Sequence, residues 1–275
     1  MDFILCRFDR RFCIVLFDQW RSVLRQIKRY TVVCTILSLI SSFPALAQSS
    51  PWGFEASSYI WLPESTTGIK TEAGNVDSEL SVSDALDQLD VGIMLTGVAQ
   101  RDRWSLVGDL VYLNLEAEEN TPFGQLYSKL ESDTTLFILN GYVFYQIYHP
   151  SDVGVGLGVG ARAVDSSVET TLRPGLLPAG SDKVSDDWVD PVLAFRLLGQ
   201  VSKSWSASLT LDFGGFGSVN ASDSTWQGAA LIAYQLTDSW LLRGGYRHLY
   251  IDREADGQSY DFEMSGALFG VSFRF

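Results

Sequence analysis

Apolar and polar residues alternate at every second position through ten segments of this chain. A period of two puts all the apolar side chains on one face of a strand, so each segment predicts a β-strand with one apolar face. The segments reach or exceed the roughly 9–11 residues that a tilted strand needs to cross a bilayer. They are Trp52–Trp61, Val91–Arg101, Trp104–Leu115, Asp133–Ile147, Asp152–Val168, Asp186–Val201, Trp205–Phe216, Ser224–Leu236, Trp240–Arg253 and Tyr260–Phe275.

The connections between these segments alternate between tight turns and longer loops. Tight turns follow the second, fourth, sixth and eighth segments, at residues 102–103, 148–151, 202–204 and 237–239. Transmembrane β-barrels show short periplasmic turns opposite longer outer loops, together with an even number of strands. We therefore expect an all-β fold, an antiparallel transmembrane β-barrel of about ten strands, with eight or twelve as the alternatives.

Three of the four tight turns are followed directly by tryptophan, at Trp104, Trp205 and Trp240. Indoles repeated at one end of successive strands are typical of the aromatic girdle at a membrane–water interface. The final segment adds a second membrane signal, since Phe273 and Phe275 continue its apolar face to the end of the chain. A strand that ends on an aromatic residue is typical of bacterial outer-membrane barrels, where it serves as an assembly signal.

Seven charged residues fall on the faces opposite the apolar ones, which in a barrel is the lumen. They are Glu55, Asp109, Asp212, Arg162, Arg196, Arg243 and Arg247. We expect them to pair across the lumen, for example Glu55 with Arg243, because an unpaired buried charge is costly. The favoured interpretation is a structural one, an ion-pair network that fills and stiffens the barrel. The alternatives are a pore whose conductance these charges set and, least favoured, a catalytic site.

Glycines at every second position from Gly154 to Gly160 should also face the lumen, where they leave space for something bulky. The first outer loop, Leu62–Asp90, is the longest, and residues 81–90 within it predict a short helix capped by Ser81 or Ser83. Its apolar stripe, which includes Val82, Ala85, Leu86 and Leu89, must be covered. The helix either packs on the barrel rim or folds into the mouth as a plug.

The first 47 residues have the three parts of an export signal. Residues 1–29 hold seven basic and three acidic residues, an apolar run follows over Thr31–Phe43, and Ala45-Leu46-Ala47 forms a cleavage motif. A membrane anchor is the alternative, but the apolar run is shorter than the ~20 residues that a spanning helix needs. We therefore predict a signal peptide at residues 1–47 and a barrel at residues 48–275. All three cysteines lie in the leader, which leaves no thiol chemistry to the rest of the chain.

Without the leader the chain holds 13 basic and 30 acidic residues, a formal net charge of −17. This charge would repel nucleic acid, so nucleic acid is not an expected partner. Acidic loops suit a surface where divalent cations bridge lipid phosphates. The expected partners are outer-membrane lipid and lipopolysaccharide, the barrel-assembly machinery and periplasmic chaperones.

The residue inventory gives little support to an enzyme. Outer-membrane lipid deacylases need a His/Ser pair facing the bilayer, and barrel proteases of the omptin type need an Asp–His couple at the outer rim. His149 falls in a tight turn, and His248 has no Ser or Asp neighbour in the sequence that would make it a base. Asp252–Glu263 has the spacing of a calcium loop, although an acidic hairpin explains the same residues. We expect no metal, no cofactor and no catalytic residues.

Several motifs resemble those of a poorly characterised group of proteobacterial outer-membrane β-barrel proteins, distantly like the small OmpA-type barrels. They are Trp52–Pro63, the helix at Ser83–Asp90, Gly108-Asp109-Leu110 with Tyr112, Gly214-Gly215-Phe216, Gly245-Tyr246-Arg247 and Gly270–Phe275. The resemblance implies location in the outer membrane of a Gram-negative bacterium and carries over no catalytic residue. The expected function is that of a non-enzymatic barrel, either structural or a narrow, porin-like gated pore for small solutes. A surface-binding barrel acting through acidic loops is the alternative, and an outer-membrane hydrolase is the weakest.

Overall fold

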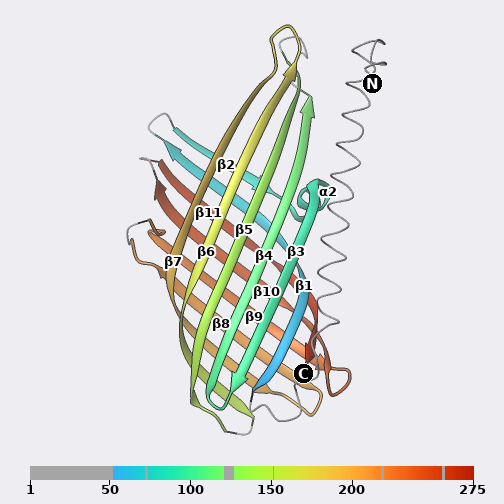
Figure 1. Cartoon of the computed structure of the whole chain (residues 1–275), viewed down its shortest axis with the longest axis vertical. Helices are drawn as coiled ribbons and strands as arrows, with labels where there is room; N and C mark the ends of the chain where they lie inside the picture. Colours follow the sequence, from blue (N-terminus) through green and yellow to red (C-terminus); the bar gives the residue numbers. More distant parts are fainter. Residues whose placement is uncertain (1–51, 72–73, 121–126, 151, 218–219, 256–257) are drawn as a thin grey trace, which may run out of the picture. The chain divides into compact units, whose positions relative to one another are not determined.

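The protein is an antiparallel β-barrel with ten wall strands, which confirms the predicted fold class (Figure 1). The computed structural model describes residues 52–275 except 72–73, 121–126, 151, 218–219 and 256–257. The predicted signal peptide lies outside the described residues. Within these described residues, eleven strands form one sheet, and the extra strand, β2, pairs only with β1. No helix among the described residues is long and apolar enough to cross a membrane.

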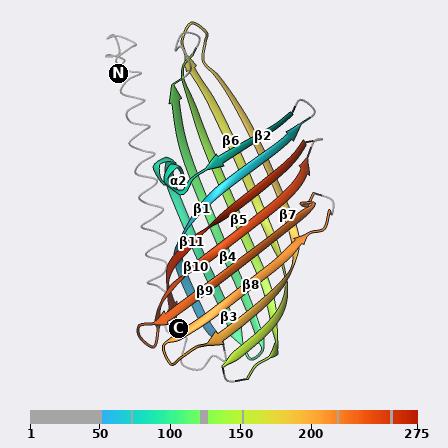
Figure 2. The same ribbon diagram turned by 180° about the vertical axis from the view of Figure 1, so that it is seen from behind.

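The elements follow one another around the barrel in chain order, as the views from opposite sides show (Figures 1 and 2). They are β1 (Gly53–Thr71), β2 (Gly74–Leu80), α2 (Val82–Gln88), β3 (Leu89–Arg101), β4 (Trp104–Asn120), β5 (Tyr127–Tyr148), β6 (Val153–Pro174), β7 (Gly180–Gln200), β8 (Trp205–Gly215), β9 (Ser224–Gln235), β10 (Trp240–Ala255) and β11 (Gln258–Arg274).

The first and last strands close the barrel. β1 and β11 pair without interruption from Glu55 opposite Arg274 to Lys70 opposite Ser259. Beside this ladder, Phe54 and Phe275 exchange both backbone hydrogen bonds, at 3.1 and 3.0 Å. Closure matters because a sheet edge in a bilayer would leave its backbone N–H and C=O groups without partners.

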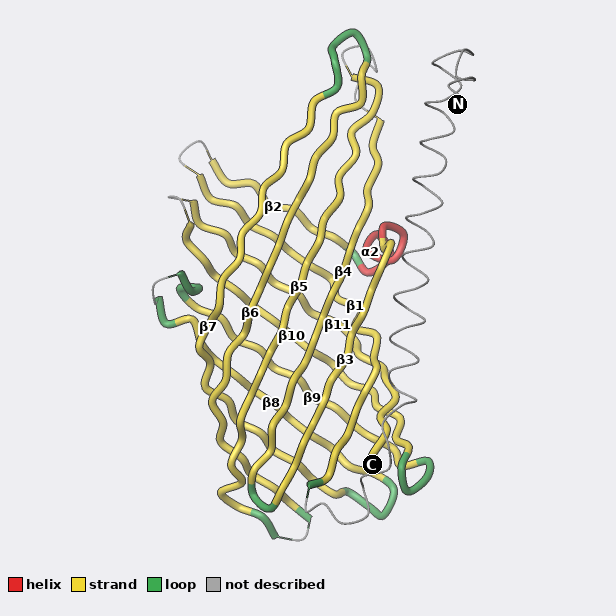
Figure 3. Tube along the Cα trace, viewed as in Figure 1, coloured by secondary structure: helices red, strands yellow, loops and turns green. Residues whose placement is uncertain are grey.

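The tight turns all lie at one end of the barrel, which we call the turn end; the opposite end is the loop end (Figure 3). The outward side chains between the two ends form a belt of exposed apolar residues. The belt includes Ile60, Leu106, Leu139, Leu157, Val159, Leu193, Leu211, Ile232, Leu242 and Phe269. A soluble protein rarely exposes so large a continuous apolar surface.

Strands β5, β6 and β7 extend much further at the loop end than the sequence predicts (Figure 1). They have 22, 22 and 21 residues, whereas β8 and β9 have 11 and 12. The predicted bounds missed these extensions because both faces there are largely polar. The period-two signal disappears when neither face packs against lipid.

The prediction of a loop over Leu62–Asp90 is wrong. β1 continues to Thr71 and turns back as β2, so that Ser65 pairs with Leu80. The predicted helix is present but shorter, over Val82–Gln88, and its N-cap is Ser81, whose hydroxyl accepts from the backbone N–H of Asp84. α2 contacts β1 and β4 at the rim and buries none of its residues, so it is not a plug deep in the lumen.

The lumen is filled by side chains in successive layers. Towards the loop end lies an apolar cluster that contains Trp61, Val111, Ile138 and Leu249, of which the last three are fully buried. Nearer the turn end, the rings of Phe144 and Tyr142 lie directly over Gly158 and Gly160, where a Cβ atom would collide with them. The glycine stretch therefore leaves space for bulky groups, as predicted, and those groups are the barrel's own aromatic rings.

Candidate functional site: a charged network across the lumen

Arg162 of β6 and Asp212 of β8 form an ion pair at 2.7 Å, with both side chains fully buried. The guanidinium also donates from Nε to Asn140 Oδ1 at 2.8 Å and from Nη1 to Thr225 Oγ1 at 2.5 Å. Asp212 Oδ2 accepts from the Tyr142 hydroxyl at 2.8 Å and from Gln227 Nε2 at 3.2 Å. Both charges are therefore paired and hydrogen-bonded on several sides, which a buried pair requires.

A second ion pair joins Arg247 of β10 to Asp109 of β4 at 2.9 Å. The hydroxyl of Tyr59 accepts from Arg247 Nη1 at 2.9 Å and donates to Asp109 Oδ2 at 2.8 Å. Thr96 donates to the same carboxylate oxygen at 2.9 Å. The Trp61 ring lies against the guanidinium, with its centroid 4.7 Å from Arg247 Cζ.

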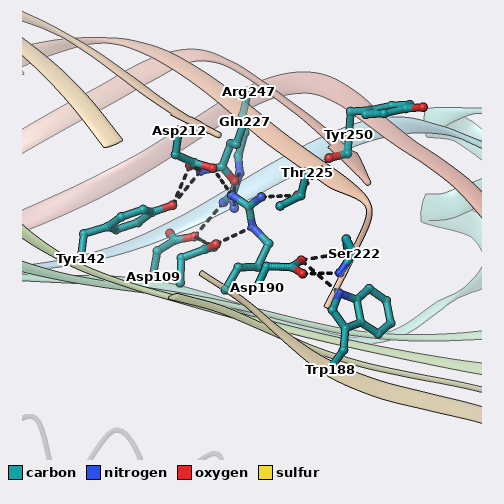
Figure 4. A network of polar contacts seen from close by, with 12 residues as sticks. Asp109, Tyr142, Trp188, Asp190, Asp212, Ser222, Thr225, Gln227, Arg247 and Tyr250 are labelled. Carbon is teal, nitrogen blue, oxygen red and sulfur yellow. Dashed lines mark hydrogen bonds and ion pairs between the residues drawn. The ribbon is translucent and has the colours of Figure 1, made fainter. Parts of the chain in front are cut away.

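Gln227 of β9 links the two ion pairs into one assembly, which we call the central network (Figure 4). Its Oε1 accepts from Arg247 Nε and Nη2 at 3.0 and 2.6 Å, while its Nε2 donates to Asp212. Asn140 adds a second link, because its Nδ2 donates to Asp109 at 3.3 Å while its Oδ1 accepts from Arg162. Side chains from eight strands thus meet across the lumen, and the two cations balance the two carboxylates.

The remaining three predicted lumenal charges lie together nearer the turn end. Glu55 accepts from Arg243 at 2.5 Å and from Arg274 at 2.9 Å. Arg196 has no hydrogen-bond partner at Nε among the described residues, and its Cζ lies 5.7 Å from the centroid of the Phe144 ring. These groups line a cavity of about 230 Å³, the turn-end cavity, which is also lined by His149.

The prediction from sequence missed Asp190 and Asp186, which lie on the inward phase of β7. Asp190 is fully buried and accepts from Ser222 N at 2.6 Å, Ser222 Oγ at 2.9 Å and Trp188 Nε1 at 3.0 Å. Asp186 pairs with Arg253 of β10 at 2.7 Å across the lumen. Both acids lie in the same alternating set of β7 positions as Arg196, so the alternation could have placed them in the lumen. No signal in the sequence identifies their partners.

His248 lies on the outward face of β10, and strand pairing brings Ser265 of β11 opposite it. The Ser265 hydroxyl is 2.6 Å from His248 Nδ1, and Glu263 Oε1 is 3.7 Å from the same nitrogen. The ring stacks on Trp226 with centroids 4.2 Å apart. A hydrolytic triad needs the serine and the carboxylate on opposite ring nitrogens, so this geometry does not build one.

The residues with calcium-loop spacing form a β-hairpin instead. Asp252 pairs with Asp261, and the ladder continues to Ala255 opposite Gln258. Ligands spread along two paired strands cannot surround an ion as a twelve-residue loop does. Among the described residues, no group of three or more His, Cys, Asp or Glu is arranged to hold a metal ion.

No family model matches this chain. No curated protein matches it either. Among solved structures, the outer-membrane protease OmpT from Escherichia coli matches with a TM-score of 0.54 at 9% identity, over 84% of this chain and 100% of that chain. This is the outer-membrane β-barrel fold. The translocator domain of the autotransporter NalP from Neisseria meningitidis matches with a TM-score of 0.46 at 11% identity, over 94% and 98% of the two chains. At these identities the comparison shows the fold and not an activity.

Proposed function

We propose that this protein is a non-enzymatic barrel of the bacterial outer membrane whose lumen is held closed by the central network. Any passage of small solutes then requires the network to rearrange, which makes the barrel a narrow gated pore. The location is supported by the exposed apolar belt and the aromatic residues next to the tight turns. The main support for a closed lumen is the complete burial of the Arg162–Asp212 ion pair inside it.

The position of the network between two cavities supports this proposal. Along β5, Gln146 lines the turn-end cavity, Asn140 belongs to the network, and Leu136 lines a second cavity of about 570 Å³, the loop-end cavity. A solute moving along the axis would have to cross the network. Removing one member of such a buried pair leaves a charge that costs roughly 3–5 kcal/mol, so the closed state dominates at rest.

The alternative function, binding of an external partner through acidic outer segments, is supported by the long β5–β7 wall. At the loop end of this wall, Asp133 of β5 is directly opposite Glu169 of β6, and Asp165 of β6 is directly opposite Asp187 of β7. Like charges in such pairs repel each other. A cationic surface would relieve this repulsion, although no described contact identifies such a partner.

Conductance in planar bilayers tests the gate. We expect the wild type to be closed most of the time and Asp109→Asn to open more often, because that change leaves Arg247 without its counter-charge. Glu131→Gln is the matched control, since Glu131 pairs with Arg173 at the exposed loop end, away from the network. A wild type that conducts steadily, with Asp109→Asn unchanged, would contradict the proposed gate.

A further inference from the structure

The wall of the barrel is interrupted between β1 and β3. Their paired register runs from Gly53 opposite Gln100 to Ser58 opposite Leu95 and stops there. Beyond this point the backbone N–H of Trp61 donates to the sulfur of Met94 at 3.0 Å rather than to a carbonyl. On this side, β1 is next paired at Ser65, with β2. We call this break in the ladder the seam.

The seam lies at the depth of the apolar belt. The other edge of β1 is paired with β11, and this pairing shows the depth of each β1 residue in the membrane. Ile60 is opposite Phe269, and both side chains are about 60% exposed on the outer surface. Two positions further on, Leu62 is opposite Ala267, and polar Glu64 and Ser265 follow. The seam therefore begins among lipid-facing side chains and ends where the belt gives way to polar residues.

The loop-end cavity connects the two sides of the seam. Its lining includes the outward-facing Ile60 as well as Leu113, Leu136 and Met264, which face the lumen. Val82 and Ala85 of α2 line it at the rim. None of the described residues that line it is charged, although the whole chain has 33 acidic and 20 basic residues. A volume of about 570 Å³ is in the range of small-ligand sites, and the uncharged lining offers no counter-charge to a charged ligand.

We propose that the loop-end cavity binds one aliphatic chain of a membrane lipid, which enters sideways from the bilayer through the seam beside α2. A chain of methylene groups is thin, apolar and already present at the depth of Ile60. The polar headgroup stays outside, level with Glu64, because the described lining offers no cation for a phosphate. The cavity borders the central network, because Tyr59 and Trp61 both line it and both contact Arg247. None of the four charged side chains of the network lines it, so binding of a chain there does not require the proposed gate to open.

Trp61 provides the readout, because it lines the cavity and is only 2% exposed. We would reconstitute the protein in vesicles of phosphatidylcholine with brominated acyl chains, since bromine quenches tryptophan fluorescence at short range. The fluorescence of Trp61 is obtained by subtracting the emission of Trp61→Phe from that of the wild type. We expect the brominated lipid to remove most of this signal.

Two phenylalanine substitutions on β3 form a matched pair of variants. A Cβ at Gly92 would meet Leu113 and Leu89 at 3.6 Å, so Gly92→Phe places its ring in the cavity. A Cβ at Gly97 would meet nothing within 4 Å. Gly97 lies on the outward face of β3, so the ring of Gly97→Phe would point away from the cavity. We expect Gly92→Phe to protect Trp61 from quenching and Gly97→Phe to leave the quenching at the wild-type level.

Gly92→Phe is usable only if it shows the heat-modifiable migration of a folded barrel. If it does not, Ala117→Phe takes its place, because Ala117 of β4 also lines the cavity. Equal quenching in the wild type and in a folded cavity-filled variant would overturn the proposal. A second arm uses 1-bromododecane added to the detergent-solubilised protein. Quenching by this free molecule, without quenching by the brominated phospholipid in vesicles, would overturn entry from the bilayer.

Discussion

Glu55 balances two guanidinium groups at once, since it accepts from both Arg243 and Arg274. Its side chain is 13% exposed and that of Arg243 is 17% exposed, so both are largely desolvated. Nearby Arg196 has no carboxylate of its own among the described contacts. Three arginines and two acids, Glu55 and Asp152, line the turn-end cavity, so its lining carries a net positive charge.

We expect Glu55→Gln and Arg243→Met each to lower the unfolding midpoint in urea, and the double variant to lose less than the sum of the two. Each single change leaves a partly buried charge unpaired, at a cost of up to ~3 kcal/mol, whereas the double change removes both charges. Glu55→Gln should cost more than Arg243→Met because it deprives two cations of their partner. Strictly additive losses would contradict the pairing.

Arg173→Met is the control, because it breaks an ion pair with Glu131 that lies exposed at the loop end. The hydrogen bond from Arg173 lowers the pKa of Glu131 below its ordinary value. A lowered carboxylate pKa adds stability above the unfolded-state pKa, and that stability is lost as the pH falls through the lowered value. Solvent screens this pair, so we expect little change in the midpoint at neutral pH.

The alternation of residues predicted seven charges that point into the lumen but missed Asp186 and Asp190 of β7. The pair of Glu55 and Arg243 followed from strand order. The other partners were not predictable. Asp109 and Arg247 lie on strands far apart around the wall, and Gln227 and Tyr59 join them only because closure brings the strands face to face. Residue spacing along one strand contains no information about contacts across a lumen.

At the scale of the elements, each of the three tryptophans after a tight turn makes the same kind of aromatic contact. Trp104, Trp205 and Trp240 each lie 4.9 Å, centroid to centroid, from an aromatic ring on the next strand. Those rings belong to Tyr145, Tyr234 and Phe273. The same pair of aromatic rings therefore recurs at three places around the turn end.

We therefore predict that all three indoles lie at one depth, at the membrane–water interface. In variants that keep only one of the three, quenchers attached near lipid headgroups should reduce emission more than quenchers at the bilayer centre. The ratio of the two effects should agree among the three variants. Clearly different ratios would show that the strands are not in the register described.

The elements that the sequence did not predict all lie beyond the belt. β2 and the outer extensions of β5–β7 are largely polar in sequence at both alternating sets of positions, so the period-two signal does not extend to them. The short helix was predictable because its capping serine and apolar stripe are local signals. A paired polar strand such as β2 gives no comparable signal.

At the scale of the whole molecule, the last strand supplies the closing edge. Phe275 forms two backbone hydrogen bonds with Phe54 and stacks on its ring at 5.7 Å between centroids. We predict that deletion of Phe275 lowers the heat-modifiable, membrane-inserted fraction in cells. Phe216→Ala is a suitable control, because Phe216 is an exposed aromatic residue away from the closing pair. Unchanged insertion of the deletion variant would count against an assembly role for this residue.

Closure between β1 and β11 also has a consequence for folding, because it joins the two ends of the barrel sequence. Glu55 and Arg274 are 219 positions apart, so we expect their contact to form after the pairing of strands that are neighbours in the sequence. Until then the incomplete sheet has two unpaired backbone edges, which are the sites where chains aggregate. The yield of this protein should therefore depend on how long the open intermediate survives degradation, and a substitution that only delays closure would lower the yield without changing the finished barrel.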